Sequence, residues 1–368
     1  MVARVARGWP RWLSLLWLLL ASACQPATAP PSPALAPHTS GLNQSEAAAE
    51  PTQGVAARTE PTARERFVLA LPAPSGTFAW AYVAKEQGIF EKYALDVELP
   101  LVRGNQTVGA GIVSGSFDVG GASVNAIDAN LQDPEIVLIA VVLSRLVASI
   151  YTKPEIASVA QLRGRTVATT QRGATLGTAL EVVLDHSGMD PNAVDIVYAG
   201  DVQAALTVLL NGQADAAVLT APSTVHARRA GMRELLNITE LNYPFVMGGL
   251  ATSKKLLQTK ADQMERFLKA VVEAIHYAKT HKAETMRAIG LYAQAADPDA
   301  QEESYNAHVP YFANKPFPTD EAIRNVLSLR TDDARTAAPS RFYDDTILRR
   351  LDRSGWLDRT INTYNQTP

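Results

Sequence analysis

The chain has 368 residues, with 34 Lys and Arg against 37 Asp and Glu and a formal net charge of −3. It carries no basic stripe, which argues against nucleic acid as a partner. Its single cysteine excludes an internal disulfide and a zinc cluster of thiolates. Residues 65–368 are long enough for two lobes, each with a core of its own.

Residues 1–23 have the pattern of an export signal. Three arginines precede the apolar run Trp12–Ala23, which is too short to span a bilayer as a helix. The run ends in small residues that lead into Cys24, similar to a bacterial lipobox, although Ala21 stands where leucine is more usual. The similarity implies a lipoprotein signal peptide and a lipid on Cys24. The alternative is an ordinary secretory signal that is cleaved after Ala23.

Residues 24–64 are rich in Pro, Ala, Thr, Ser and Gln and contain almost no large apolar side chains. Such a segment cannot bury enough surface to offset the entropy of ordering it, so we expect a disordered tether. Signal and tether together predict an exported domain. It would be lipid-anchored at the outer face of the cytoplasmic membrane or free in the periplasm.

Strands and helices alternate from residue 66 onwards. The hydrophobic patterns predict strands at 66–71, 93–99, 117–120 and 135–143, and helices at 78–87, from 104 to 114 and after the turn 121–125. The apolar run 135–143 is typical of a strand buried on both faces of a mostly parallel sheet. The order of elements predicts an α/β fold.

The same order returns in the next hundred residues. We expect strands at 162–170, 194–198 and 214–219 and helices at 174–187, 202–210 and from Pro222 onwards. The repetition predicts two similar lobes. A long helix at 259–279 carries one apolar stripe, and residues 281–368 should form a helical tail on the first lobe.

The segment Thr166–Leu180 illustrates the kind of site that this fold offers. A short strand turns on Gly173 into a helix, so backbone N–H groups and the positive end of the helix dipole face outward. The spacing of Gly173 and Gly177 fits neither a P-loop nor the dinucleotide fingerprint. An anion or a polar head group is therefore the expected ligand, and an ordinary βα turn is the alternative.

Four phrases carry a family resemblance. They are Tyr82–Glu98 (YVAKEQGIFEKYALDVE), Gly115–Gly120 (GSFDVG), Leu162–Ala168 (LRGRTVA) and Asn211–Ala217 (NGQADAA). Together they resemble the solute-binding proteins of ABC importers, in the group that binds nitrate, taurine, aliphatic sulfonates and thiamine precursors. The likeness covers residues 66–290, and the order of the phrases is more specific than any one of them.

The resemblance implies a two-lobed periplasmic-binding-protein fold of the second type. Lobe one would comprise residues 65–148 plus 250–368, and lobe two residues 149–249, with hinge crossovers near 148–152 and 243–250. The protein would be a monomer without a cofactor that closes on a small anionic or polar organic solute and delivers it to an ABC permease. An enzyme on the same fold, like a thiamine-pathway synthase or a desulfinase, and a surface sensor are the alternatives.

In that fold the solute touches βα turns of both lobes. This nominates Ser75, Gly76, Thr77, Phe78, Trp80, Gly121, Ala122 and Ser123 from lobe one, and Arg172, Gly173, Ala174, Thr175, Gly200, Asp201, Thr220 and Ala221 from lobe two. Arg145, near the first crossover, could clamp a sulfonate or a carboxylate.

Several nominated residues have a structural alternative. Ser75, Thr77 and Asp201 could simply cap helices, Trp80 could be buried in its lobe, and Arg145 could lie on the surface beside the hinge. An Asp201 that faces the cleft would repel an anion and favour a solute with an amine. The histidines show no metal-binding spacing, and no serine, cysteine or carboxylate pair has a catalytic context, so we expect neither a metal nor catalytic residues.

Overall fold

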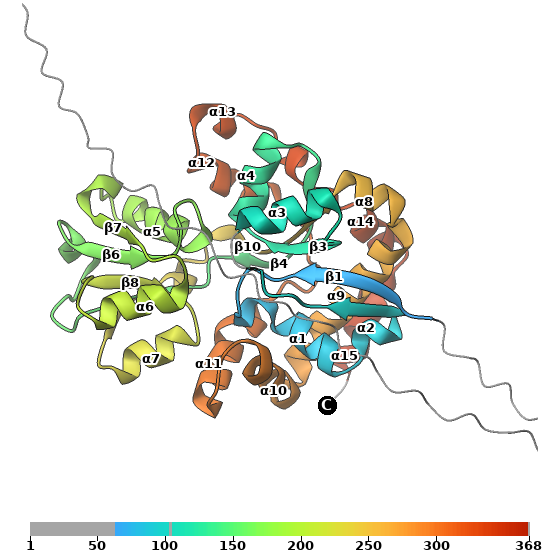
Figure 1. Ribbon diagram of the computed structural model, residues 1–368, viewed down its shortest axis with the longest axis horizontal. Helices are drawn as coiled ribbons and strands as arrows, with labels where there is room; N and C mark the ends of the chain where they lie inside the picture. Colours follow the sequence, from blue (N-terminus) through green and yellow to red (C-terminus); the bar gives the residue numbers. More distant parts are fainter. Residues whose placement is uncertain (1–62, 103–104, 367–368) are drawn as a thin grey trace, which may run out of the picture. The chain divides into compact units, whose positions relative to one another are not determined.

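Two five-stranded sheets organise the structure, a computed structural model that describes residues 63–102 and 105–366 (Figure 1). The first sheet has the order β2-β1-β3-β10-β4. Its strands are β1 (Glu65–Ala70), β2 (Leu95–Glu98), β3 (Val119–Ala122), β4 (Ile136–Arg145) and β10 (Pro244–Ser253). β1 is parallel to β2 and β3, whereas β10 runs antiparallel to β3 and β4.

The second sheet repeats this plan with the order β7-β6-β8-β5-β9. Its strands are β5 (Ser149–Thr152), β6 (Thr166–Thr169), β7 (Asp195–Tyr198), β8 (Ala216–Leu219) and β9 (Arg233–Asn237). β6 is parallel to β7 and β8, and β5 is antiparallel to β8 and β9. The predicted α/β class with two similar halves is confirmed.

Helices connect the parallel strands in both halves (Figure 1). The first half contains a 3-10 turn, η1 (Gly76–Phe78), followed by α1 (Ala79–Glu86), α2 (Ile89–Lys92), α3 (Asn105–Ser114) and α4 (Val124–Gln132). The second half contains α5 (Thr175–His186), α6 (Val202–Leu210) and α7 (Ser223–Arg229), with 3-10 turns η2 (Val159–Leu162), η3 (Pro191–Ala193) and η4 (Ile238–Leu241). The helix predicted at 202–210 has the predicted bounds.

Asp118, in the second of the four phrases, has a structural role in the first sheet. Its buried carboxylate accepts a hydrogen bond from the backbone N–H of Val68 (2.8 Å) and contacts Lys260 Nζ (2.5 Å). Its backbone carbonyl accepts a hydrogen bond from the hydroxyl of Thr252 (2.7 Å). Asp118 therefore ties β1 and β10 to the loop that precedes β3.

Asp215, in the matching phrase of the second half, has the same role. Its carboxylate accepts hydrogen bonds from the backbone N–H of Thr166 (3.2 Å) and from Lys153 Nζ (2.9 Å). The hydrogen bond from Lys153 holds the pKa of Asp215 below its ordinary value. The phrases that carry the family likeness thus fix the two sheets internally.

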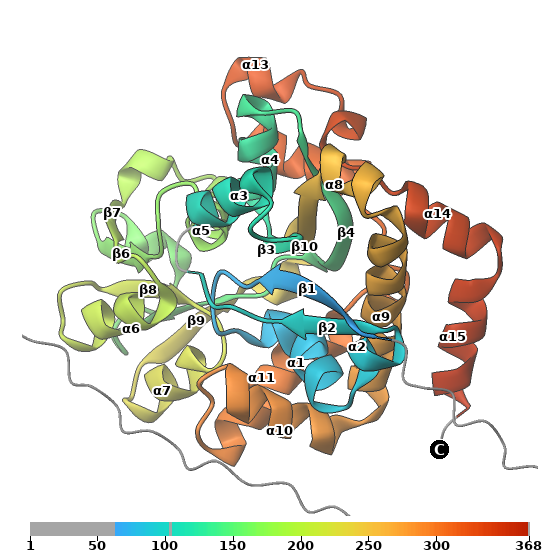
Figure 2. The ribbon, with the colours of Figure 1, turned by 45° about the vertical axis from the view of Figure 1, so that its right-hand side comes forward.

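The C-terminal helices pack mainly on the first half. They are α8 (Lys254–Thr259), α9 (Ala261–Thr280), α10 (Lys282–Tyr292), α11 (Pro298–His308), α12 (Asp320–Ser328), α13 (Asp332–Arg335), α14 (Thr346–Arg353) and α15 (Trp356–Asn365), with the 3-10 turns η5 (Val309–Tyr311) and η6 (Pro339–Phe342). Phe267 of α9 stacks on Phe67 of β1 with ring centroids 4.6 Å apart. The helix α15 lies beside α9 (Figure 2).

Tail segments also cover the outer edge of the first sheet. Val141 N donates to Pro316 O (2.8 Å) and Ala313 N donates to Val142 O (2.7 Å). Because β4 is an edge strand, these bonds occupy backbone groups that would otherwise remain open to pairing with another chain.

The second crossover lies earlier than predicted. Residues 244–253 form one strand, β10, which pairs with β3 and β4 of the first sheet, whereas the prediction has a hinge crossover near 243–250. Pro244 and the pair Gly248-Gly249 are turn signals in sequence, and they favour a connection over a strand here. The sequence does not predict β5 and β9, and β5 occupies the expected first crossover at 148–152.

The signal, Cys24 and most of the tether lie outside the described residues. Within residues 63–102 and 105–366, none of the helices combines the length and the apolar character needed to cross a bilayer.

Candidate functional site

A cavity of about 740 Å³ is lined by the βα turns of both sheets. On the first side it is lined by the turns that follow β1, β2 and β3, together with Met247 of β10 and Gln294 of the C-terminal tail. On the second side it is lined by the turns that follow β6, β7 and β8. Turns that follow the carboxyl ends of parallel strands are where ligands bind in open α/β sheets. This cavity is therefore the candidate functional site.

On the first side the cavity is lined by the turn that contains η1. Ser75 is the N-cap of η1 and accepts a hydrogen bond from the backbone N–H of Thr77 (3.3 Å), so the predicted capping role is confirmed. Phe78 lines the cavity, and its ring packs against Gly121, where an added Cβ would lie 2.7 Å from the ring. The absence of a side chain at Gly121 thus leaves room for the Phe78 ring.

Gly76 has a similar supporting role on the other side of η1. A Cβ at this position would lie 2.6 Å from Nδ1 of His308 and 2.9 Å from the carbonyl oxygen of Ser304. The absence of a side chain lets η1 rest directly on α11. The position of the turn that lines the cavity therefore depends on the C-terminal tail.

On the second side, the helices α5 and α6 begin at the cavity. Gly173 has φ +72°, which suits the tight turn before α5, and the N-cap Ala174 makes no side-chain capping hydrogen bond. Asp201 is the N-cap of α6, and its carboxylate accepts a hydrogen bond from Ala204 N (2.8 Å). The predicted cap is confirmed, and Asp201 also lines the cavity.

Most of the residues nominated from the sequence gather around this cavity. Those that line it are Ser75, Thr77, Phe78, Ala122, Ser123, Ala174, Thr175, Gly200, Asp201, Thr220 and Ala221. The lining does not include Gly76, Trp80, Gly121, Arg145, Arg172 and Gly173. A role in solute binding stays a prediction for both groups.

The large nominated side chains outside the lining have other partners. Trp80 is buried and packs edge-on against Phe267, 6.4 Å between centroids, so the alternative of burial in its lobe is the one observed. The Arg172 guanidinium lies over the ring of Tyr198, 4.6 Å from its centroid.

Arg145 lies at the end of β4, beside the crossover. Its Nη1 donates to the side-chain oxygen of Asn242 (2.5 Å), and the guanidinium lies 5.1 Å from the centroid of Tyr311. Arg145 thus lies at the position beside the hinge, and a clamp on an acidic solute stays a prediction.

The comparisons with known proteins agree with this geometry. A family model described as NMT1/THI5 like matches residues 75–285. The chain belongs to the NMT1/THI5-like family. The predicted family resemblance is thereby confirmed. No curated protein matches the chain significantly.

Solved structures show where the fold of this NMT1/THI5-like protein recurs. The aliphatic sulphonate binding protein SsuA from Escherichia coli is 18% identical, with a TM-score of 0.60 over 78% of this chain and 96% of that one. The alkanesulfonate-binding protein SsuA from Xanthomonas axonopodis pv. citri is 17% identical, with a TM-score of 0.61 over 78% of this chain and 98% of that one.

The periplasmic nitrate-binding protein NrtA from Synechocystis PCC 6803 is 13% identical, with a TM-score of 0.62 over 81% of this chain and 91% of that one. At these identities the likeness shows the fold. The predicted two-lobed fold of periplasmic binding proteins, with its C-terminal helical tail, is confirmed.

Sequence reasoning missed more than half of the lining. The additional residues are Pro72, Ala73, Pro74, Leu101, Asn125, Thr170, Gln171, Leu176, Val202, Gln203, Ala204, Thr207, Pro222, Ser223, Met247 and Gln294. Most of them are neighbours of nominated residues and could have been found by widening each turn. Met247 and Gln294 could not, because they reach the cavity from a strand and a tail segment that are distant in sequence.

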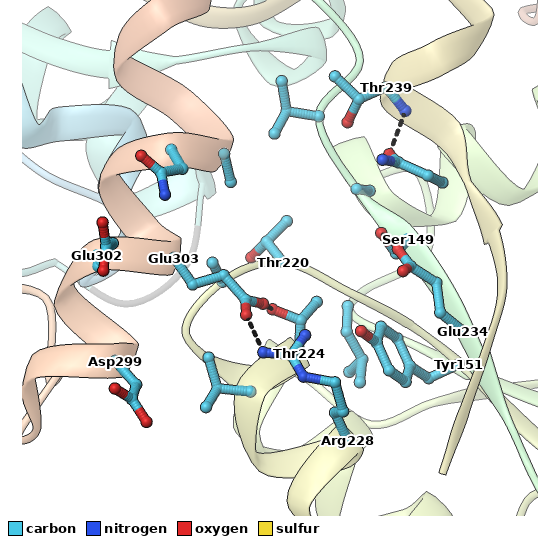
Figure 3. A pocket seen from close by; sticks show the side chains of 18 of the residues that line it. Ser149, Tyr151, Thr220, Thr224, Arg228, Glu234, Thr239, Asp299, Glu302 and Glu303 are labelled. Atoms are coloured by element: carbon cyan, nitrogen blue, oxygen red, sulfur yellow. Dashed lines mark hydrogen bonds and ion pairs between the residues drawn. The ribbon is translucent and has the colours of Figure 1, made fainter.

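This family member has a second cavity, of about 600 Å³, between α7, α11, β5 and β9 (Figure 3). Arg228 forms an ion pair with Glu303, which also accepts a hydrogen bond from the hydroxyl of Thr224. On the same face Arg229 pairs with Asp297 (2.9 Å) and Asp299 (2.7 Å). The charged groups here satisfy one another and join α7 to α11.

Metal binding has no structural support in the part of the chain that the structure describes. No group of three or more His, Cys, Asp and Glu side chains in that part is arranged to hold a metal ion.

Proposed function

We propose that this chain is the extracytoplasmic solute-binding component of an ABC importer, which captures a small solute between two lobes. One observation carries the proposal: a single cavity of about 740 Å³ is lined by turns from both sheets. Its volume lies within the range of small-molecule sites. The family membership and the printed roles of SsuA and NrtA support the same conclusion.

Capture would proceed by hinge closure. The two connections between the sheets lie side by side and are joined by a hydrogen bond from Leu146 N to Tyr243 O (3.2 Å). Two adjacent connections define one axis about which the lobes can rotate. We place the lobes at residues 65–148 plus 244–368 and 149–243, which moves the second boundary to the start of β10.

A cavity-filling variant tests the proposal. Thr175 is half-buried at the first turn of α5 and lines the cavity, so Thr175→Trp should fill part of it. Thr259→Trp, at an exposed position at the end of α8, is the matched control. Titration calorimetry would cover nitrate, taurine, alkanesulfonates, aromatic carboxylates and hydroxymethylpyrimidines.

We expect one class of these solutes to bind the wild type and the control, and to bind Thr175→Trp at least tenfold more weakly. Equal affinity in all three proteins would place the site elsewhere. Incubating the bound solute and analysing it for conversion tests the further expectation that the protein performs no chemistry.

The membrane attachment is a separate part of the proposal. A lipid on Cys24 would keep the binding domain near the ABC permease that receives the solute. Labelling cells with a radioactive fatty acid should mark the wild type and leave Cys24→Ser unmarked. Equal labelling of both would show that Cys24 is not the lipidation site.

A further inference from the structure

Charged side chains of α7 and α11 connect the two proposed lobes. α7 lies in the lobe between the two connections, whereas α11 and its N-cap Asp297 lie in the C-terminal tail of the other lobe. Arg228 pairs with Glu303, and Arg229 pairs with Asp297 (2.9 Å) and Asp299 (2.7 Å). Each of these ion pairs therefore crosses from one lobe to the other. We call these five side chains the α7–α11 bridge.

The carboxylate of Glu303 is the centre of the bridge. Its side chain is 24% exposed, and it also accepts a hydrogen bond from the hydroxyl of the buried Thr224. Figure 3 shows this carboxylate reaching from α11 to Thr224 and Arg228 on α7. A single exposed ion pair contributes little, but a carboxylate that is held by a guanidinium and a hydroxyl together is fixed more firmly. The bridge is therefore a defined contact between the lobes.

The start of α7 joins the bridge to the candidate functional site. Pro222 and Ser223 line the cavity of about 740 Å³, and Thr224, which contacts Glu303, is the next residue of the chain. Thr220, in the turn before them, lines both cavities. The turn that follows β8 is thus one wall of the candidate site, and the chain directly after it is tied to the other lobe.

The second cavity separates the bridge from the hinge. This cavity, of about 600 Å³, is lined by Val147 and Ala148 of the first connection and also by Arg228 and Glu303 of the bridge. When two lobes rotate about a hinge, groups at a distance from the axis change their separation. The attraction between two charges falls as they move apart. The bridge is therefore sensitive to the angle between the lobes.

We infer that Arg228, Arg229 and Glu303 are positioning residues for solute binding, which hold the lobes at the separation at which turns of both line one cavity. The inference rests on the proposed function, because it concerns a wall of the same cavity. Loss of the bridge lets α7 move away from α11 and lowers the fraction of molecules with a complete cavity. The apparent affinity for the solute falls with that fraction. Salt screens partly exposed ion pairs and has the same effect.

The separation of the lobes can be measured without any solute. Spin labels are attached at the exposed positions Ala230, at the end of α7, and Leu291, in α10, in the full chain with Cys24→Ser, which removes the native thiol. Double electron–electron resonance at low salt should give a longer and broader distance distribution for Arg228→Glu than for the parent protein. The double variant R228E/E303R exchanges the two charges and should restore the parent's distribution, because the Thr224 hydroxyl can also accept a hydrogen bond.

Lys282→Glu is the matched control for this measurement. Lys282 pairs with Glu302 (2.6 Å), the neighbour of Glu303 on α11, and this pair stays within one lobe. The control should keep the parent's distance distribution. Glu303→Gln removes the charge at nearly constant size and gives the same comparison if the charge reversal impairs folding. An unchanged distribution in Arg228→Glu and Glu303→Gln, or a swapped pair that does not restore it, would overturn the inference.

Titration calorimetry connects the bridge to the candidate site. The probes are nitrate, taurine, hexanesulfonate, benzoate and hydroxymethylpyrimidine. A probe that binds the wild type should bind Arg228→Glu at least about fivefold more weakly and R228E/E303R with nearly the wild-type affinity. Raising NaCl from 0.05 M to 0.5 M should weaken binding to the wild type more than binding to Arg228→Glu. Equal salt dependence of the two proteins would contradict the role of the bridge.

The importer proposal and this inference fail in different ways. If Thr175→Trp loses binding and Arg228→Glu keeps the wild-type affinity, the importer proposal stands and this inference falls. If Thr175→Trp keeps the wild-type affinity, the result counts against the importer proposal. The distance measurement then still decides whether the bridge holds the two lobes together, because it needs no solute.

Discussion

His308 should make the protein sensitive to acid, and the size of the effect follows from its burial. The side chain lies in α11 with no exposed surface, beneath the η1 turn that lines the cavity. Its Nδ1 is 2.9 Å from Ser304 O and can donate a hydrogen bond to it, and Nε2 has no hydrogen-bond partner among the described residues. Burial lowers the pKa of His308 to about 4 from its ordinary value of 6.5.

The sign and the magnitude follow from linkage. Between pH 6.5 and pH 4 the unfolded chain binds a proton at this position and the folded chain does not, so the free energy of unfolding falls as the pH falls. One pKa unit corresponds to about 1.4 kcal/mol, so the loss attributable to His308 is about 3 kcal/mol between pH 7.5 and pH 4. The stability is fully present above pH 6.5.

Urea unfolding followed by circular dichroism at pH 7.5, 6.0, 5.0 and 4.0 measures this loss. His308→Leu removes the titrating group and the unpartnered Nε2, so its free energy of unfolding should decline by about 3 kcal/mol less than that of the wild type over this range. His186→Leu, which removes an exposed histidine, is the matched control. Parallel pH profiles for the wild type and His308→Leu would refute the reasoning.

Three further predictions concern contacts within the first sheet and between α11 and the rest of the chain. Asp118→Asn should lower the free energy of unfolding by about 3 kcal/mol in urea titrations, because it leaves Lys260 without its buried partner; a loss below about 1 kcal/mol would show that the pair is not structural. Gly76→Val should displace η1 from α11 and weaken binding of the solute found in the calorimetric screen at least tenfold; wild-type affinity would show that the turn tolerates a side chain. Arg229→Ala should lower the free energy of unfolding slightly in 0.05 M NaCl and less in 0.5 M NaCl, because its ion pairs are exposed and screened by salt; a loss independent of salt would contradict an electrostatic role.

The repeated order of strands and helices could be predicted from sequence because each βα unit has local sequence signals. Hydrophobic periodicity, Gly88 at the end of α1 and Asp201 at the start of α6 are signals within a few residues of each other. The long strand β10 was different. Its place between β3 and β4 depends on pairing with residues about a hundred positions away, and no local pattern encodes that.

The same distinction explains the candidate site. Positions in βα turns, such as Thr175 and Ala122, could be predicted because the fold places these turns at one edge of each sheet. Glycines were harder to assign, because Gly76 and Gly121 resemble ligand-facing residues in sequence and in fact pack against His308 and Phe78.

Native mass spectrometry of the protein purified from its own membrane fraction tests the central claim most directly. The account predicts that the wild type carries one copurified small molecule, which is absent from Thr175→Trp. The same molecule at the same occupancy in both proteins would contradict the claim that the cavity between the two sheets holds the solute.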